Sequence, residues 1–260
     1  MDDDPVLLEM KGSVATVSLN RPDRHNATDD ATDALLFRYL DLLRTDPDVR
    51  VVVLRGNGPS FSAGRDLAEV DERPVGVSDI ELIERRQWGT RLLYDFPVPI
   101  VCALKGWVLG TGFERALLCD LRVASDSAKM ALSAIHHGHV GDAAGIAQLH
   151  EIGGSALALD MALTGRLISS HDALRLHLVS WVVADEDLDD VVRDLAEKIA
   201  ARPPLVVRLL REHVHSLAAP DVASTLRREL VSQAMVVSSR DHAEFRASRV
   251  ENREPRYEKR

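Results

Sequence analysis

The run Val49–Leu54 limits the fold of this chain more than any other segment. It contains four valines and a leucine, so aliphatic side chains occupy almost every position instead of alternating with polar ones. A strand with this pattern is covered on both faces, as happens when helices pack on each side of a parallel sheet. The run therefore predicts an α/β protein in which strands and helices alternate.

The segments before this run fit the same architecture. Val6–Met10 and Val14–Leu19 have the composition of two short strands joined by a turn. Apolar residues then recur at helical spacing from Thr28 to Leu43, and Pro47 closes that helix. The chain therefore begins with two strands and a helix, and the buried strand follows them.

After the run, strands and helices continue to alternate, and helices dominate from Gly145 onward. We expect a helix over 80–94, a strand over 97–104, a glycine-rich turn over 108–112, a helix over 113–118 and a strand over 121–124. Helical periodicity follows over 145–152, 155–163, 170–176, 187–201, 204–217 and 221–237, with one strand over 179–183. We predict an α/β core over residues 1–200 and a helical C-terminal subdomain over 201–260.

Composition and charge exclude several classes of protein. The 32 Lys and Arg residues are outnumbered by 41 Asp and Glu residues, and the resulting net charge of -9 disfavours general nucleic-acid binding. The two cysteines cannot form a disulfide framework. The start Met1-Asp2-Asp3-Asp4 lacks the basic segment of a signal peptide. The longest apolar run, Phe96–Leu104, is about half of the roughly 20 residues that a membrane span needs. We expect a cytoplasmic protein that binds neither nucleic acid nor membrane.

Two glycine-containing turns are candidates for ligand binding. Phe61–Leu67 reads Phe-Ser-Ala-Gly-Arg-Asp-Leu, and Gly106–Glu114 places glycines before a helix with a carboxylate in its first turn. Glycines let a backbone approach a ligand closely, and N–H groups at a helix start attract negative charge. Each turn alone is also typical of an ordinary loop, and the second lacks the spacing of phosphate- or dinucleotide-binding motifs.

The segment Ser133–Asp142 places the histidines His136, His137 and His139 close together. Their spacing suits a metal site poorly, because adjacent residues on a strand point to opposite faces and Asp142 is the only carboxylate nearby. We therefore expect no metal site. A serine hydrolase is also disfavoured, because the Gly-x-Ser-x-Gly elbow of that class is absent.

Taken in this order, the segments resemble the crotonase superfamily, which is also called the enoyl-CoA hydratase/isomerase family. Five segments carry the resemblance: 20–27 (Asn-Arg-Pro, then His-Asn-Ala), 61–67, 99–125, 163–169 and 173–179. The resemblance implies a spiral of ββα units followed by helices that build a homotrimer, often doubled to a hexamer. It also implies an acyl-CoA thioester as the ligand, with coenzyme A as part of the substrate and no separate cofactor.

The resemblance further implies an oxyanion hole for a thioester enolate, made of the backbone N–H groups of Arg65 and Thr111. Glu114 matches the first of two glutamates that hydratases of the family use. The second falls on Ala134, which cannot transfer a proton. Asp142 matches a position that carries a carboxylate in isomerases of the family, so we expect Glu114 and Asp142 to be the catalytic pair.

For coenzyme A, the resemblance suggests that Arg24 contacts a phosphate group. It suggests that the backbone around Ala63, Asp66 and Leu67 contacts the adenine and pantetheine. Tyr257 and Lys259 of the C-terminal tail are expected to reach the ligand of a neighbouring subunit.

The activity that we expect is double-bond isomerisation of an enoyl-CoA or dienoyl-CoA, with one carboxylate abstracting a proton and the other returning it elsewhere. Hydration of a 2-enoyl-CoA is an alternative, with water held by Asp142 or a histidine. A crotonase homologue that binds acyl-CoA without catalysis is another, because the second glutamate is missing. The roles of His136, His137 and His139 stay open.

Overall fold

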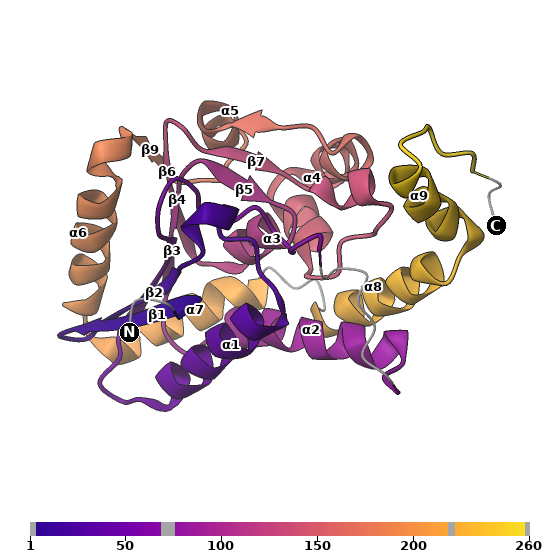
Figure 1. Cartoon of the computed structure of the whole chain (residues 1–260). Coiled ribbons are helices and arrows are strands. Elements are labelled where there is room, and N and C mark those ends of the chain that lie inside the picture. The colour runs from indigo at the N-terminus through magenta and orange to yellow at the C-terminus, as the bar shows by residue number, and fades with distance from the viewer. Residues whose placement is uncertain (1–3, 69–75, 218–221, 258–260) are drawn as a thin grey trace.

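The computed structural model describes residues 4–68, 76–217 and 222–257. Its main sheet has the strand order β1-β2-β3-β4-β6-β9, and Figure 1 shows helices on both of its faces. The strands are β1 (Val6–Lys11), β2 (Val14–Leu19), β3 (Val51–Gly56), β4 (Ile100–Leu104), β6 (Leu121–Ser125) and β9 (Trp181–Val183). In this sheet β1 and β2 are antiparallel, and each following pair of neighbours is parallel.

The valine run is buried on both faces, as its composition predicts. Val52 and Leu54 belong to the main core, whereas Val51 and Val53 pack in a second cluster with residues of α6 (Leu188–Ala200). Helix α6 covers that face of the sheet, and helices α1 (Asp30–Thr45), α2 (Asp79–Tyr94) and α3 (Thr111–Leu118) lie on the other (Figure 1). The predicted α/β class is confirmed.

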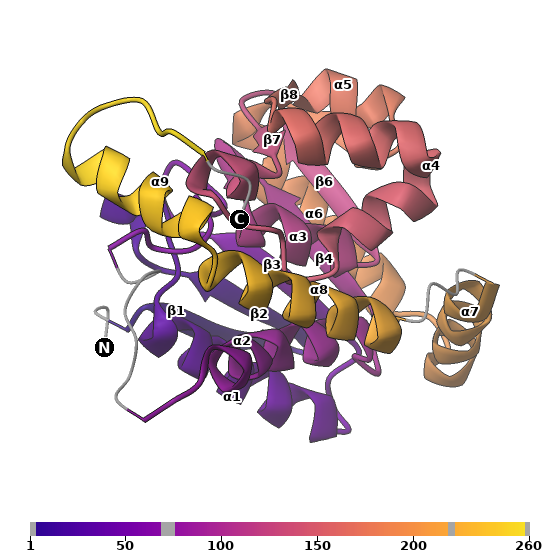
Figure 2. The same cartoon turned by 90° about the vertical axis from the view of Figure 1, so that its right-hand side faces the viewer.

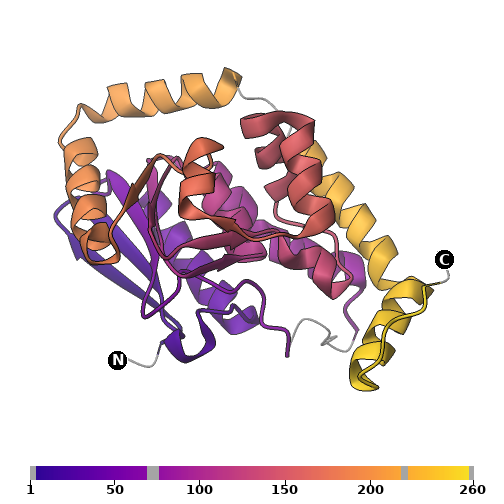
Figure 3. The ribbon, with the colours of Figure 1, turned by 90° about the horizontal axis from the view of Figure 1, so that it is seen from above.

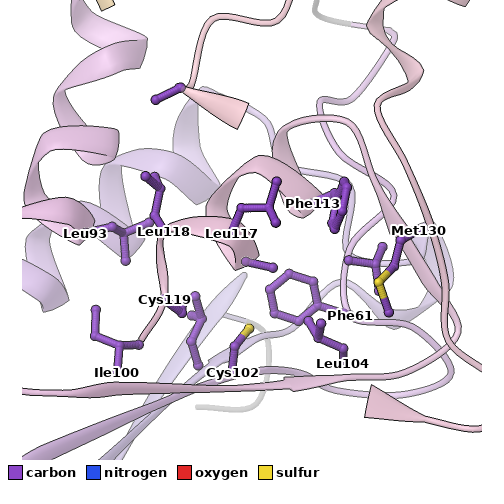
Figure 4. Close-up of a cluster of buried hydrophobic side chains, with 14 of the residues drawn as sticks. Phe61, Leu93, Ile100, Cys102, Leu104, Phe113, Leu117, Leu118, Cys119 and Met130 are labelled. Atoms are coloured by element: carbon purple, nitrogen blue, oxygen red, sulfur yellow. The ribbon is translucent and has the colours of Figure 1, made fainter. Parts of the chain in front are cut away.

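Aliphatic, aromatic and sulfur-containing side chains fill the main core (Figure 4). Phe61, from the loop after β3, and Phe113, from α3, are among its largest fully buried side chains. Cys102 and Cys119 are free and buried in the same cluster, and burial raises the pKa of the Cys102 thiol well above its ordinary value. The two glycine-containing turns are therefore anchored to the core, the first through Phe61 and the second through Phe113 of α3.

A small second sheet, β5-β7-β8, was not predicted. Its strands are β5 (Trp107–Leu109), β7 (Lys129–Ala131) and β8 (Ile168–Ser169), and they are too short to give a readable periodicity. β5 occupies part of the segment expected to be a turn, and α3 begins at Thr111, two residues before the expected start. A bridge between Ser62 and Val108 joins β5 to the loop after β3.

The C-terminal half is mainly helical, as predicted, with two differences. The two helices expected over 145–163 are one element, α4 (Gly145–Thr164), which is kinked at Gly154 with φ of 70° and ψ of -176°. Helix α9 (Arg240–Val250) was not predicted. The other C-terminal helices are α5 (Ser170–Arg175), α7 (Pro204–Leu217) and α8 (Val222–Val237). The described residues also form the 3-10 helices η1 (Pro22–Arg24), η2 (Ser133–His137) and η3 (Asp185–Asp187).

Helices α7 and α8 follow one another in the sequence but extend in different directions over the molecule (Figures 2 and 3). Helix α7 stands at one side, where Arg211 bonds to Asp120 at 2.7 Å. Helix α8 runs beside α2, where the Gln87 side chain donates to the Leu226 carbonyl at 3.0 Å. Within the described residues, we find no helix that is long and apolar enough to cross a membrane.

The contact between α1 and α2 gives a first testable prediction. A Cβ atom at Gly89 of α2 would lie 1.7 Å from Cε1 of Phe37 on α1. Gly89→Ala should therefore destabilise the fold by about 1–3 kcal/mol, because the clash outweighs the better helix propensity of alanine. Urea unfolding measures this cost, and it should shrink in a Phe37→Leu background. An equal cost in both backgrounds would contradict the assigned contact.

Candidate active site

The two glycine-containing turns lie against each other. The Ser62 N–H donates to the Trp107 carbonyl and the Leu109 N–H donates to the Ser62 carbonyl, both at 2.9 Å. Gly64 has φ of 89°, and a Cβ atom there would lie 2.7 Å from the Leu109 oxygen. The close approach of the two turns therefore requires glycine at position 64.

This contact places the two predicted oxyanion-hole residues in the wall of one cavity. A parallel bridge joins Thr28 and Arg65, and its bonds are made by the neighbours Gly64 and Asp66. In this geometry the Arg65 amide points away from Thr28. Thr111 begins α3, where the helix provides no carbonyl partner for the first amides. Arg65 and Thr111 both line a cavity of about 290 Å³.

Glu114 lies in the first turn of α3, is 2% exposed and lines the same cavity. Its Oε1 atom is buried and has no hydrogen-bond partner among the residues that the structure describes. A Cβ atom at Gly141 would lie 2.5 Å from this oxygen, and one at Gly145 would lie 2.5 Å from Glu114 Cγ. The two glycines therefore let the chain close tightly around this carboxyl group.

Burial raises the pKa of Glu114 to about 8, and the nearby charges of Asp142 and Glu229 add to the effect. The backbone amides of Ala143 and Gly145 act in the opposite direction but are weaker. A carboxyl group with this pKa keeps its proton at neutral pH. Glu114 can therefore act as an acid.

Asp142 lines the cavity beside Glu114, and burial raises its pKa as well. The positive charges of Arg86, Arg65 and Arg115 act in the opposite direction. These arginines favour the charged form of Asp142, whereas no nearby cation is among the influences on Glu114. The two carboxyl groups thus meet different surroundings, and Asp142 is the better candidate for the base.

Glu229 is a third carboxyl group in this cluster, and the sequence analysis missed it. It lies on α8, is 7% exposed and accepts the Ala144 N–H at 2.9 Å. Ala144 has φ of 62°, a left-handed conformation that is unfavourable for alanine, so this bond supports a strained residue two positions after Asp142. Burial raises the pKa of Glu229 to about 8. No local motif marks Glu229, because its partner is 85 residues away in the sequence.

The three histidines lie in different places. His136 bonds to the Gly165 carbonyl at 3.0 Å and is exposed, whereas His137 and His139 line the cavity. Burial lowers the pKa of His137, and Arg249 adds to this effect. Within residues 4–68, 76–217 and 222–257, no group of three potential metal ligands gathers.

The residues predicted to contact coenzyme A are scattered. Ala63 and Leu67 line the cavity, whereas Asp66 bonds to Arg21 at 3.2 Å. Arg24 is exposed on η1, and Tyr257 is 55% exposed near the C-terminus. Lys259 lies outside the described residues. Their role in binding coenzyme A stays a prediction.

Glu114→Gln should stabilise the folded chain above about pH 5. An ordinary glutamate ionises near 4.5, whereas folded Glu114 holds its proton up to about 8. Unfolding is therefore favoured increasingly as the pH rises between these values, and glutamine avoids this loss. Urea unfolding at several pH values should show the variant's advantage growing with pH by more than ~1 kcal/mol. The exposed Glu84→Gln is the control, and a constant advantage would contradict the shifted pKa.

Glu229→Gln should lower the pKa of Glu114, because the charge of Glu229 is one of the causes that raise it. Glutamine can still accept the Ala144 N–H, so the fold should be retained. Glu229→Leu removes that acceptor as well and should cost about 1–3 kcal/mol of stability. Carbon-13 NMR of labelled glutamate carboxyls follows the titration, and an unchanged Glu114 signal in Glu229→Gln would refute the coupling.

Comparison with known proteins places this site in a family. Residues 9–260 match the sequence profile of the enoyl-CoA hydratase/isomerase family. The (E)-benzylidenesuccinyl-CoA hydratase of Thauera aromatica is 38% identical over 211 residues, which cover 80% of this chain and 81% of that protein. The 1,2-epoxyphenylacetyl-CoA isomerase of Escherichia coli is 29% identical over 255 residues, which cover 97% of each protein.

Among solved structures, the enoyl-CoA hydratase/isomerase from Pseudoalteromonas atlantica matches with a TM-score of 0.87 and 28% identity. The match covers 97% of this chain and 99% of that one. The fold predicted from the resemblance is therefore confirmed. The chain belongs to the enoyl-CoA hydratase/isomerase family of the crotonase superfamily.

Proposed function

We propose that this chain shifts the double bond of an unsaturated acyl-CoA thioester by proton transfer through an enolate. The observation that carries the proposal is that Glu114 and Asp142 line one cavity, where burial raises the pKa of both and three arginines oppose this rise only at Asp142. A double-bond shift needs a base at one carbon and an acid at another, and this pair can supply both.

The amides of Arg65 and Thr111 are the proposed donors for the enolate oxygen. Both residues line the cavity, and their amides come from the two turns that touch through Ser62 and Gly64. In enzymes that stabilise an oxyanion, losing one such donor reduces the rate by about 10²–10³. Because backbone donors do not depend on the side chain, Arg65 and Thr111 can serve although neither is glycine.

The proton would move in two steps. Asp142 removes a proton from the acyl chain, and the electron pair of that C–H bond delocalises into the thioester to form the enolate. Glu114 then protonates a different carbon, and the double bond forms at the new position. Asp142 ends protonated and Glu114 ionised, so a proton must return from Asp142 to Glu114 before the next turnover.

Hydration of a 2-enoyl-CoA is the second candidate. It is supported by the name of the Thauera aromatica relative, which is a hydratase. Ala134, however, lines the cavity with a methyl group at the position where the resemblance places a second glutamate. Hydration would therefore need Asp142 or another polar group to hold the water.

Isotope incorporation separates the two reactions. The purified chain is incubated in heavy water with 2-enoyl-, 3-enoyl- and 3,5-dienoyl-CoA esters, and the products are read by mass spectrometry. Isomerisation predicts deuterium in the acyl chain without added water. Asp142→Asn should abolish it, while Asp41→Asn, an exposed carboxylate on α1, should not.

A product heavier by one water would instead support hydration. Full isomerase activity in Asp142→Asn would refute the two-carboxylate mechanism even if an isomerised product forms.

A further inference from the structure

The buried side chain of Asp33 connects the two elements that carry the proposed oxyanion-hole amides. Asp33 lies in the first turn of α1 and is 5% exposed. Its Oδ2 atom accepts from Nη1 of Arg65 at 2.9 Å and from Nη2 of Arg115 at 2.8 Å. Arg65 belongs to the turn after β3, and Arg115 follows Glu114 in α3. One carboxylate oxygen on α1 therefore holds both elements.

The beginning of α1 fixes both arginines at further points. Thr28, just before the helix, accepts from Nη1 of Arg115 at 3.4 Å, and the Arg115 guanidinium carbon lies 5.4 Å from the centroid of the Phe37 ring. Asp30 accepts from Nη2 of Arg65. The side chains of Arg65 and Arg115 are only 11% and 5% exposed. Buried arginines held by several partners have few alternative orientations, because each bond left unmade costs free energy.

This bridge bears on the oxyanion hole because the two proposed amides come from different elements. The bonds of Ser62 align the turn after β3 with β5, which precedes α3. The bridge through Asp33 is a second connection, made from α1. Two connections at separate points fix the orientation of one element relative to another, whereas a single connection leaves a hinge. Donors stabilise an oxyanion best when they are held in place before the reaction.

We infer that Asp33 is a positioning residue of the oxyanion hole, which fixes the placement of the Arg65 and Thr111 amides through its bridge to Arg65 and Arg115. All three bridging side chains line the cavity, and Asp33 acts through the two arginines. The inference rests on the proposed enolate mechanism. It makes the polarisation of the thioester carbonyl depend on a carboxylate of α1.

Two substitutions of Asp33 separate the loss of the bridge from the loss of its charge. In Asp33→Asn, the amide oxygen can take the place of Oδ2 and keep both bonds. The amide nitrogen then replaces Oδ1, which has no hydrogen-bond partner among the described residues. Asp33→Leu accepts no hydrogen bond and releases both arginines. Asp41→Leu is the matched control, because Asp41 also lies on α1 and pairs with Arg44 at the exposed surface.

Carbon-13 NMR of butanoyl-CoA labelled at its thioester carbonyl reports polarisation by the oxyanion hole, and the saturated chain has no double bond to shift. In the wild type, we expect the bound carbonyl signal downfield of the free ligand. Asp33→Leu should lose most of this shift. It should also lower kcat, for the ester that is isomerised in heavy water, by about 10- to 100-fold, because the donors are displaced and not removed. Asp33→Asn should keep most of the shift, and Asp41→Leu should change neither quantity.

A second variant covers the case in which Asp33→Leu does not fold. Arg115→Met frees α3 but leaves Arg65 bonded to Asp33 and Asp30, and it should lose the carbonyl shift in the same way. A purely structural role would lower stability in urea without moving the carbonyl signal.

The outcomes separate this inference from the proposed function. A carbonyl shift that survives in whichever of Asp33→Leu and Arg115→Met folds overturns the inference alone. An equal loss in Asp33→Asn and Asp33→Leu also overturns it, because the asparagine variant can form both bonds. A wild type that does not bind butanoyl-CoA, or binds it without a carbonyl shift, overturns the proposed enolate mechanism and the inference with it.

Discussion

Two hydrogen bonds between Ser62 and the strand β5 join the loop after β3 to the turn before α3. The first turn follows β3 and the second follows β4. Without this pairing, each would be an ordinary loop at the end of a strand. With it, Arg65 and Thr111 line one cavity, and the first turn of α3 places Glu114 in the same wall. The glycine at position 64 is required because the backbones touch there.

The carboxyl groups around this cavity reduce the stability of the folded chain. Glu114, Asp142 and Glu229 come from three separate segments, and burial raises the pKa of each. Bringing them together disfavours their charged forms, so the folded chain is less stable at high pH than it would be with neutral side chains. Such an arrangement is typical of sites that move protons, where stability is given up for reactivity.

The C-terminal helices are part of the site and not only a cover for it. Glu229 and Gln233 of α8 bond to the segment around Asp142 at Ala144 and Val140. The expected domain boundary at residue 200 falls between α6 and α7. The helices after it nevertheless supply Glu229, whose charge contributes to the raised pKa of Glu114 in the α/β core. The site therefore depends on how α8 packs against α2, where Gln87 bonds to the backbone of Leu226.

The sequence by itself determined the α/β class, because the valine run between Val49 and Leu54 requires two covered faces. It also determined the order of most strands and helices, and the motif resemblance pointed to Glu114, Asp142 and the two turns. These features depend on local periodicity and on contiguous motifs, which a sequence displays directly.

Only the tertiary structure decided the rest. The strands of the second sheet are two or three residues long and owe their form to pairing with distant segments. Glu229 and Gln233 lie 85 and 93 residues from their backbone partners, so no local pattern marks them. The raised pKa of Glu114 follows from neighbours that the fold brings together, since burial is a property of the packed chain.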